Sequence, residues 1–253
     1  MSANDGGEIL TSAAAAPVQN LPVRLIRAAL AALLPGAVLA APPAAAETMR
    51  SATCDGATYR YLLVAPKFNR PKPALLLLHG AGGHAHDLVL PWRSFAETHD
   101  IVLIAPELSN KRAFEAIAPA VFRCIVEDAR TATPIDPKRI FVLGHSMGGY
   151  LAYDAAMFQS EYFAAVAASA AAVDPDFDGI LEKATRKIPI AIFIGERDPQ
   201  VPLASVRRTR DLLVSAGFPV LYEEIPDHDH QYELAADRIN REAWKFFEAH
   251  PLP

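Results

Sequence analysis

From Tyr59 onward, short apolar runs alternate with longer segments in which apolar residues recur at helical spacing. The predicted strands are Tyr59–Val64, Ala74–Leu78, Ile101–Ala105, Arg139–Leu143, Phe163–Ala167, Pro189–Ile194 and Val220–Ile225. The predicted helices are Leu90–Thr98, Glu115–Thr131, Gly148–Gln159, Leu203–Ala216 and Leu234–Ala249. Several strands are continuously apolar, as expected of parallel strands covered on both faces. The pattern predicts an α/β fold whose mostly parallel central sheet is flanked by helices.

The first 46 residues follow a different pattern. Arg24 and Arg27 precede an apolar run over residues 28–40, and small residues continue to Ala46. These are the three parts of a secretory signal peptide, and the apolar run is too short to span a bilayer comfortably. We expect residues 1–46 to be an N-terminal extension with a signal peptide, cleaved after Ala46, with Ala40 as second choice. Residues 47–253 then form the folded domain of an exported, periplasmic or extracellular protein without stable membrane insertion. A membrane-anchoring helix is the alternative, and the long polar segment before Arg24 leaves the true start open.

Composition excludes several classes of protein. The chain has 24 Lys and Arg against 29 Asp and Glu, a net charge of −5, so it lacks the basic excess that nucleic-acid binding needs. Two cysteines are too few for a tetrathiolate zinc site or a disulfide scaffold. Export permits one disulfide between Cys54 and Cys124, and two unpaired thiols are the alternative.

A glycine-rich hexapeptide, Gly144-His145-Ser146-Met147-Gly148-Gly149, joins a predicted strand directly to a predicted helix. Gly-x-Ser-x-Gly in that context forms a nucleophile elbow. The turn is so tight that side chains two residues either side of the serine would collide, hence the glycines. We therefore predict Ser146 as a nucleophile, and an incidental serine in a glycine-rich turn is the alternative.

A nucleophilic serine needs a base, and the base needs an orienting carboxylate. In this type of fold the acid follows a later strand, and the histidine comes near the end of the chain. Asp198 follows the strand Pro189–Ile194 and is the predicted acid. The competing carboxylates are those of Glu196, Asp174, Asp176 and Asp178. Two histidines, His228 and His230, follow the last strand, and spacing alone leaves either as the base.

Acyl transfer also requires donors aimed at the carbonyl oxygen as it becomes an oxyanion. The elbow supplies one donor, the backbone N–H of Met147. The loop His79-Gly80-Ala81-Gly82-Gly83 follows the strand Ala74–Leu78 and is rich in glycine. We predict the second donor at Ala81, with Gly82 as the alternative.

Two rival sites use the same loops. Histidines two residues apart, His84 with His86 and His228 with His230, could be zinc ligands near Asp87, but the spacing matches none of the helical two-histidine patterns. The dinucleotide fingerprint Gly-x-Gly-x-x-Gly is absent because position 85 is alanine. We therefore expect no metal and no cofactor, with His84, His86 and Asp87 at the rim of the entrance.

The chain resembles the α/β-hydrolase superfamily over residues 55–250. The resemblance is carried by His79-Gly80, the elbow hexapeptide, Gly195-Glu196-Arg197-Asp198 and the late His230. The layout is similar to that of small secreted esterases grouped with poly(3-hydroxybutyrate) depolymerases, feruloyl esterases, and dienelactone-hydrolase-like or prolyl-oligopeptidase-like domains. The loop Asp229-His230-Gln231-Tyr232 also resembles the Asp-His-Ser-Tyr segment of S-formylglutathione hydrolases, in which that histidine is the base. This likeness favours His230 over His228.

The resemblance implies a serine hydrolase that cleaves carboxylic esters through an acyl-enzyme, with Ser146, Asp198 and His230 as a triad. Only residues 170–188 separate the sixth and seventh predicted strands, where the superfamily often inserts a lid, so a minimal lid or none is expected. An open site would suit small-molecule or polymer-end esters, such as hydroxyalkanoate or aromatic esters. A peptidase or amidase of the same fold and a catalytically silent binding protein are the alternatives. Acyl and alcohol specificity and oligomeric state stay open.

Overall fold

The computed structural model describes residues 46–67, 70–108 and 117–253. Within these ranges the strands are β1 Ala46–Cys54, β2 Ala57–Ala65, β3 Lys72–Leu78, β4 Val102–Pro106, β5 Ile135–His145, β6 Val166–Ser169, β7 Ile190–Gly195 and β8 Val220–Ile225. The helices are α1 Ala85–His99, α3 Ala120–Ala132, α4 Met147–Phe158, α5 Leu203–Ser215 and α6 Tyr232–Glu248, with a 3₁₀ helix η1 at Pro175–Lys183.

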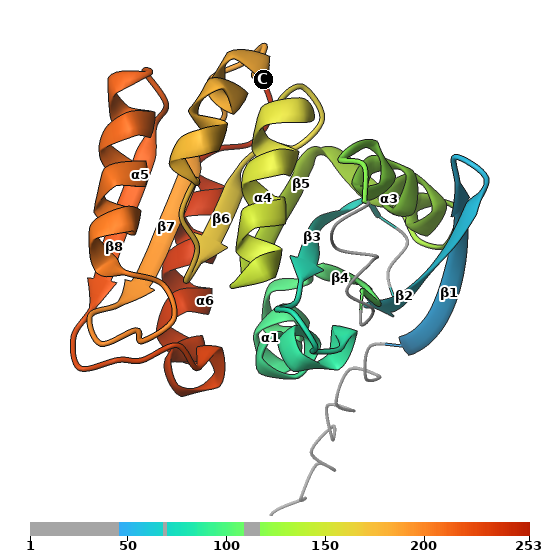
Figure 1. The fold of residues 1–253 in the computed structure, drawn as a ribbon. Coiled ribbons are helices and arrows are strands. Elements are labelled where there is room, and N and C mark those ends of the chain that lie inside the picture. Colours follow the sequence, from blue (N-terminus) through green and yellow to red (C-terminus); the bar gives the residue numbers. More distant parts are fainter. Residues whose placement is uncertain (1–45, 68–69, 109–116) are drawn as a thin grey trace, which may run out of the picture. The chain divides into compact units, whose positions relative to one another are not determined.

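The eight strands form one sheet in the order β1-β2-β4-β3-β5-β6-β7-β8 (Figure 1). The pairs β1–β2 and β2–β4 are antiparallel. All the other neighbouring pairs, from β4–β3 to β7–β8, are parallel. The predicted α/β fold with a mostly parallel sheet is confirmed.

Helices cover both faces of this sheet. Core side chains of α3, α4 and α5 pack on one face. Those of α1 and α6 pack on the other. The residues from Leu75 to Leu78 in β3 are fully buried between the two layers, which explains their unbroken apolar run. In such sheets, reactive groups gather where the parallel strands end at their carboxyl edge.

Several elements differ from the prediction in presence or extent. The edge strand β1 was not predicted, because most of its side chains are exposed and it has no apolar run. Helix α1 begins at Ala85 rather than Leu90, and its polar first turn is held by Asp87 Oδ2, which accepts the His84 N–H at 2.8 Å. Strand β6 begins at Val166, three residues after the predicted start, although the preceding residues are buried too. A buried apolar segment that does not pair with the sheet therefore has the same sequence pattern as a buried strand.

Cys54, the last residue of β1, forms a disulfide with Cys124 of α3, and their Cα atoms are 6.0 Å apart. Of the two alternatives for these cysteines, a disulfide or two unpaired thiols, the structure contains the disulfide. In the part of the chain that the structure describes, no helix combines the length and apolar character needed to cross a membrane.

Candidate active site

Ser146 lies at the sharp junction between β5 and α4, with a backbone φ of 54° and ψ of −122°. A positive φ is uncommon for a residue other than glycine and persists only where the surroundings enforce it. Here the Ser146 N–H donates to the Ser169 carbonyl at 2.8 Å, and the Ser146 carbonyl accepts the Gly149 N–H at 2.8 Å. These bonds hold the serine above the carboxyl end of β5.

Glycine is required on both sides of Ser146, at Gly144 and Gly148, because a side chain there would collide with the main chain, as the elbow motif predicts. A Cβ atom on Gly144 would stand 1.9 Å from the Gly148 carbonyl oxygen. One on Gly148 would stand 1.9 Å from the carbonyl oxygen of Leu78 in β3. No side chain fits at either position without moving the main chain.

The loop between β8 and α6 brings His230 to the serine. His230 Nε2 is 3.0 Å from Ser146 Oγ, and His230 Nδ1 is 2.7 Å from Asp198 Oδ2. In the tautomer that satisfies both contacts, Nδ1–H donates to the carboxylate and Nε2 accepts from the serine hydroxyl. The imidazole is 13% exposed and the carboxylate is 0% exposed. The serine hydroxyl thus has a proton acceptor that is itself oriented by a buried anion.

Asp198 is fixed by its own loop, after β7. Its Oδ1 accepts the backbone N–H groups of Gln200 at 2.8 Å and Val201 at 2.9 Å. With Oδ2 on His230, both carboxylate oxygens are engaged. The competing Glu196 is exposed to solvent.

The other competitors lie elsewhere. Asp174 caps η1 by accepting the Asp176 N–H at 2.9 Å, and Asp178 pairs with Arg208. His228 accepts the Arg197 N–H with its backbone carbonyl, 2.9 Å away. Within the described residues its side chain makes no hydrogen bond to Ser146 or Asp198. The geometry brings together Ser146, His230 and Asp198 and leaves the alternatives outside.

His145 is a member of this site that sequence analysis did not assign. Its ring centroid is 5.0 Å from that of His230, and its Nδ1 is 3.3 Å from Ser169 Oγ. Burial, together with the charge that His230 can carry, lowers the pKa of His145 to about 4. The His145 imidazole is therefore neutral at neutral pH, and it packs against the ring of His230. The sequence places His145 next to Ser146 in the elbow, which could have indicated a role in the site. The direction of its side chain, however, depends on the fold.

A cavity of about 280 Å³ opens in front of the serine. Ser146, His230, Gly80, Ala81 and Gly83 are among its lining residues, whereas Gly82 is not. Met147 is the first residue of α4, so its backbone N–H has no partner within the helix. Both predicted oxyanion donors, Ala81 and Met147, thus lie next to the cavity or the serine.

His79 anchors the loop that carries Ala81. This side chain is 1% exposed, its Nδ1–H donates to the Gly80 carbonyl at 2.8 Å, and its Nε2 accepts the Leu108 N–H at 3.0 Å. Burial lowers the pKa of His79, outweighing the opposite effect of the Gly80 carbonyl. A neutral histidine with a defined tautomer therefore sets the direction of the loop.

The histidines considered as zinc ligands are paired with separate carboxylates. His84 Nδ1 is 3.1 Å from Glu107 Oε1, and His86 Nε2 is 2.9 Å from Glu47 Oε1. Across the described ranges, no group of three or more His, Cys, Asp or Glu side chains could hold a metal ion. Of the three residues expected at the rim of the entrance, Asp87 lines the cavity, whereas His84 and His86 are not among its lining residues.

Comparisons with known proteins agree with this fold. A model described as the Alpha/beta hydrolase family matches residues 75–252. NocK of Nocardia uniformis subsp. tsuyamanensis, provisionally named an esterase, is 26% identical over 175 residues, which are 62% of this chain and 50% of that protein. The chain therefore spans about half the length of this curated relative.

Two solved structures are similar to the chain. A thermostable esterase has a TM-score of 0.64 and 25% identity, covering 81% of this chain and 63% of that one. S-formylglutathione hydrolase from Staphylococcus aureus has a TM-score of 0.69 and 18% identity, covering 81% of this chain and 98% of that one. The resemblance inferred from the motifs is confirmed, because the family match extends over most of the chain: the protein belongs to the alpha/beta hydrolase family.

Proposed function

We propose that the protein is a serine hydrolase that cleaves carboxylic esters through an acyl-enzyme. One observation carries the proposal: a serine at a strained elbow has its hydroxyl 3.0 Å from His230 Nε2, and that imidazole is 2.7 Å from a buried Asp198. Nucleophile, base and orienting carboxylate in this geometry are the requirements for acyl transfer. The esterases among the similar proteins support the same class of reaction.

In the proposed first step, Ser146 Oγ attacks the ester carbonyl carbon while its proton passes to His230 Nε2. The carbonyl oxygen becomes an oxyanion facing the N–H groups of Met147 and Ala81, a kind of interaction worth about 10²–10³-fold in kcat for one donor. When the intermediate collapses, His230 protonates the departing alcohol. Water, deprotonated by the same imidazole, then attacks the acyl carbon. The second intermediate collapses by breaking the bond to Ser146 Oγ, which takes the proton back from His230 as the acid is released. Asp198 stabilises the imidazolium in both halves of the reaction.

The proposed substrates are esters with small or exposed acyl groups, including polymer ends. The segment between β6 and β7 holds the short η1, and the cavity in front of Ser146 measures about 280 Å³. Hydroxyalkanoate and aromatic esters fit this description.

The test is hydrolysis of p-nitrophenyl esters from acetate to dodecanoate by the wild type and by Ser146→Ala. We expect serine-dependent rates that fall beyond short chains, with a loss in kcat of about 10⁴-fold or more in the variant. Asp198→Asn should lose less, because it leaves nucleophile and base in place. Full activity of Ser146→Ala would sink the proposal. Labelling of Ser146 by a fluorophosphonate without ester hydrolysis would direct the search to peptide amides.

We also propose that residues 1–46 are an export leader and that residues 47–253 are the mature catalytic domain. The Cys54–Cys124 disulfide supports an oxidising compartment. N-terminal sequencing of the protein from periplasm or medium should begin at Glu47, or at Ala41 if cleavage follows Ala40. Recovery of the uncleaved chain in the cytosol would contradict the proposal.

A further inference from the structure

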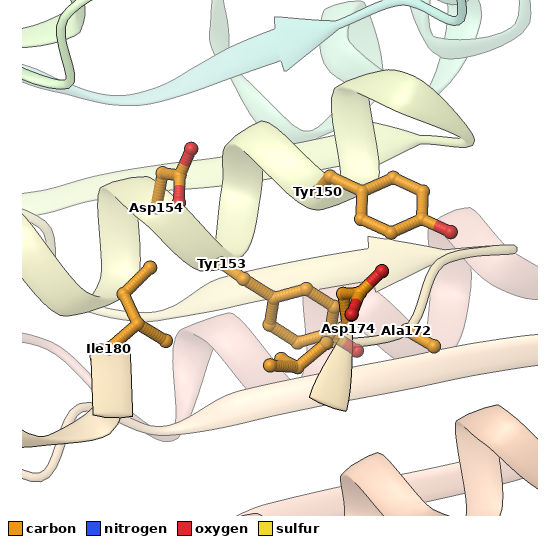
Figure 2. Close-up of a pocket in the computed structure, with 7 residues that line it drawn as sticks. Tyr150, Tyr153, Asp154, Ala172, Asp174 and Ile180 are labelled. Carbon is orange, nitrogen blue, oxygen red and sulfur yellow. The ribbon is translucent and has the colours of Figure 1, made fainter. Parts of the chain in front are cut away.

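A second groove lies beside α4, outside the cavity that contains His230. It measures about 260 Å³ and is lined by Tyr150, Tyr153 and Asp154 of α4 and by the segment that follows β6, including Val173, Asp174 and Ile180. Figure 2 shows the Tyr153 side chain extending from α4 toward Ala172 and Asp174, with Tyr150 about one turn closer to the start of the helix. The walls therefore combine aromatic, aliphatic and acidic side chains.

The carboxylate of Asp154 is the unusual feature of this groove. It is half-buried, and within the described residues it has no hydrogen-bond or ion-pair partner. Burial alone raises the pKa of Asp154 to about 6. A pocket shaped only for an aliphatic chain would not keep an uncompensated carboxylate in its wall, because burying such a group costs free energy.

The other charges of the groove have the same sign. Asp174 lines it, and no Lys or Arg among the described residues does. Arg208 reaches the neighbouring loop, but it is paired with Asp178 and bonded to the Val173 carbonyl. Two tyrosine rings add the negative potential of their faces, which attracts cations. The groove lacks a positive charge, and an alkylammonium group would supply it.

The groove is also within reach of the serine. Ser146 precedes α4, so Tyr150 and Asp154 lie about 6 Å and about 12 Å further along the helix axis. Tyr150 lies between the two regions: its pKa is raised by burial, and next by the charges of Asp174 in the groove and Asp198 beside the base.

The chemistry indicates which half of an ester would enter. His230 must protonate the departing alcohol, so the alcohol lies on the side of the cavity that His230 lines. Because Tyr150 lines the groove and His230 does not, we assign the groove to the acyl half. We propose that this groove is an acyl subsite selecting esters whose acyl chain ends in an alkylammonium group. The inference rests on the proposed esterase function and names the substrate class of the same site.

The test compares two matched substrates, the p-nitrophenyl esters of 5-(trimethylammonio)pentanoic acid and of its neutral isostere 6,6-dimethylheptanoic acid. We expect the wild type to prefer the cationic ester by about tenfold in kcat/KM, as a cation facing aromatic rings and a carboxylate predicts. Asp154→Asn should abolish most of that preference. Asp237→Asn, an exposed residue of α6 on the opposite face of the sheet, is the matched control for a change in net charge. Equal rates on the two esters, or an unchanged ratio in Asp154→Asn, would overturn the inference.

A failure of the esterase proposal is recognised separately, as the absence of a Ser146-dependent rate on either ester. The subsite is then judged by binding of hexyltrimethylammonium, measured by calorimetry on Ser146→Ala and on Ser146→Ala/Asp154→Asn. Weaker binding by the double variant supports the subsite, and equal affinity rejects it.

Discussion

Burial shifts the pKa values of His145 and Asp154 into or within the range between about pH 4 and about pH 6. The first is an imidazole packed against the base, and the second is a carboxylate in the wall of the groove. Desolvation shifts the protonation equilibrium of each toward its neutral form. They shift stability in opposite directions over overlapping pH ranges, so each effect is measured with its own variant.

For His145, the folded protein has a pKa of about 4 and the unfolded chain one near 6.5. As pH falls from 6.5, the unfolded state binds a proton and the folded state does not, so stability declines until about pH 4. The loss amounts to about 2–3 kcal/mol at order of magnitude. With Gln in place of His145, the free energy of unfolding in urea should decline between pH 7 and pH 4 by less than in the wild type, and the difference should equal that amount. His250→Gln is the control, and an equally steep decline in His145→Gln would contradict the argument.

For Asp154, the folded pKa is about 6 and the unfolded value near 3.8. As pH rises, the unfolded chain releases this proton before the folded protein does. The free energy of unfolding therefore falls between about pH 4 and pH 6 and remains at the lower value above pH 6. Asp154→Asn should therefore raise the free energy of unfolding at pH 8 by about 1–2 kcal/mol, discounted for partial exposure. The gain should vanish near pH 3.5. Urea titrations at both pH values measure it, and a destabilised variant at pH 8 would show that Asp154 has a partner.

At the scale of elements, a buried hydrogen-bond chain joins α1 to α6. Trp92 Nε1–H donates to the Tyr232 hydroxyl at 2.9 Å, which donates to Asn240 Oδ1 at 2.6 Å. Asn240 Nδ2–H donates to the Pro91 carbonyl at 3.0 Å. Tyr232 comes two residues after His230 and lines the cavity, whereas α1 follows the loop of Ala81. The chain therefore ties the loop of the base to the loop of the oxyanion donor.

Asn240→Leu should leave the Tyr232 hydroxyl and the Pro91 carbonyl without this partner. Leaving the buried Tyr232 hydroxyl without its acceptor costs about 1–3 kcal/mol, so the free energy of unfolding should fall by about that amount. Chemical denaturation measures the loss, with the exposed neighbour Arg241→Ala as control. A fall below about 0.5 kcal/mol would mean that the network carries little stability.

Elements buried on both faces could be predicted from the sequence. The continuous apolar runs of β3 and β7 are visible without a structure because both faces of these strands are covered. Strand β1 could not be predicted, because an edge strand with exposed side chains has no such run. The start of α1 was hidden by polar residues whose capping role depends on geometry.

The same distinction holds for the site. Ser146 and Asp198 could be predicted from their places after strands, because parallel strands end at one edge of the sheet. His228 and His230 occupy one loop, so spacing cannot choose between them, and only the direction of the imidazole does. The groove beside α4 could not be predicted, since it depends on how the segment after β6 packs against Tyr153 and Asp154.

On the scale of the whole molecule, the covalent brace and the catalytic groups lie in different halves of the sheet. Ser146, Asp198 and His230 follow β5, β7 and β8, whereas the disulfide joins β1, at the opposite edge, to α3. Arg50 of β1 adds a contact there, with its guanidinium 3.1 Å from Asp128 of α3. The antiparallel hairpin at that edge is therefore fastened to the parallel core from outside the site.

Breaking the brace should lower stability without changing the chemistry. The cysteines are 70 residues apart in sequence, and closing a loop of that size lowers the entropy of the unfolded chain by an amount worth about 4 kcal/mol. The double variant Cys54→Ser/Cys124→Ser should melt well below the oxidised wild type. Dithiothreitol should lower the melting temperature of the wild type in the same way. It should not lower that of the variant further. Its kcat on a short-chain p-nitrophenyl ester at 25 °C should stay within about twofold, because the triad does not contact the hairpin. Melting curves followed by circular dichroism, paired with that assay, test both statements. Parallel loss of activity and stability would mean that the edge hairpin supports the site after all.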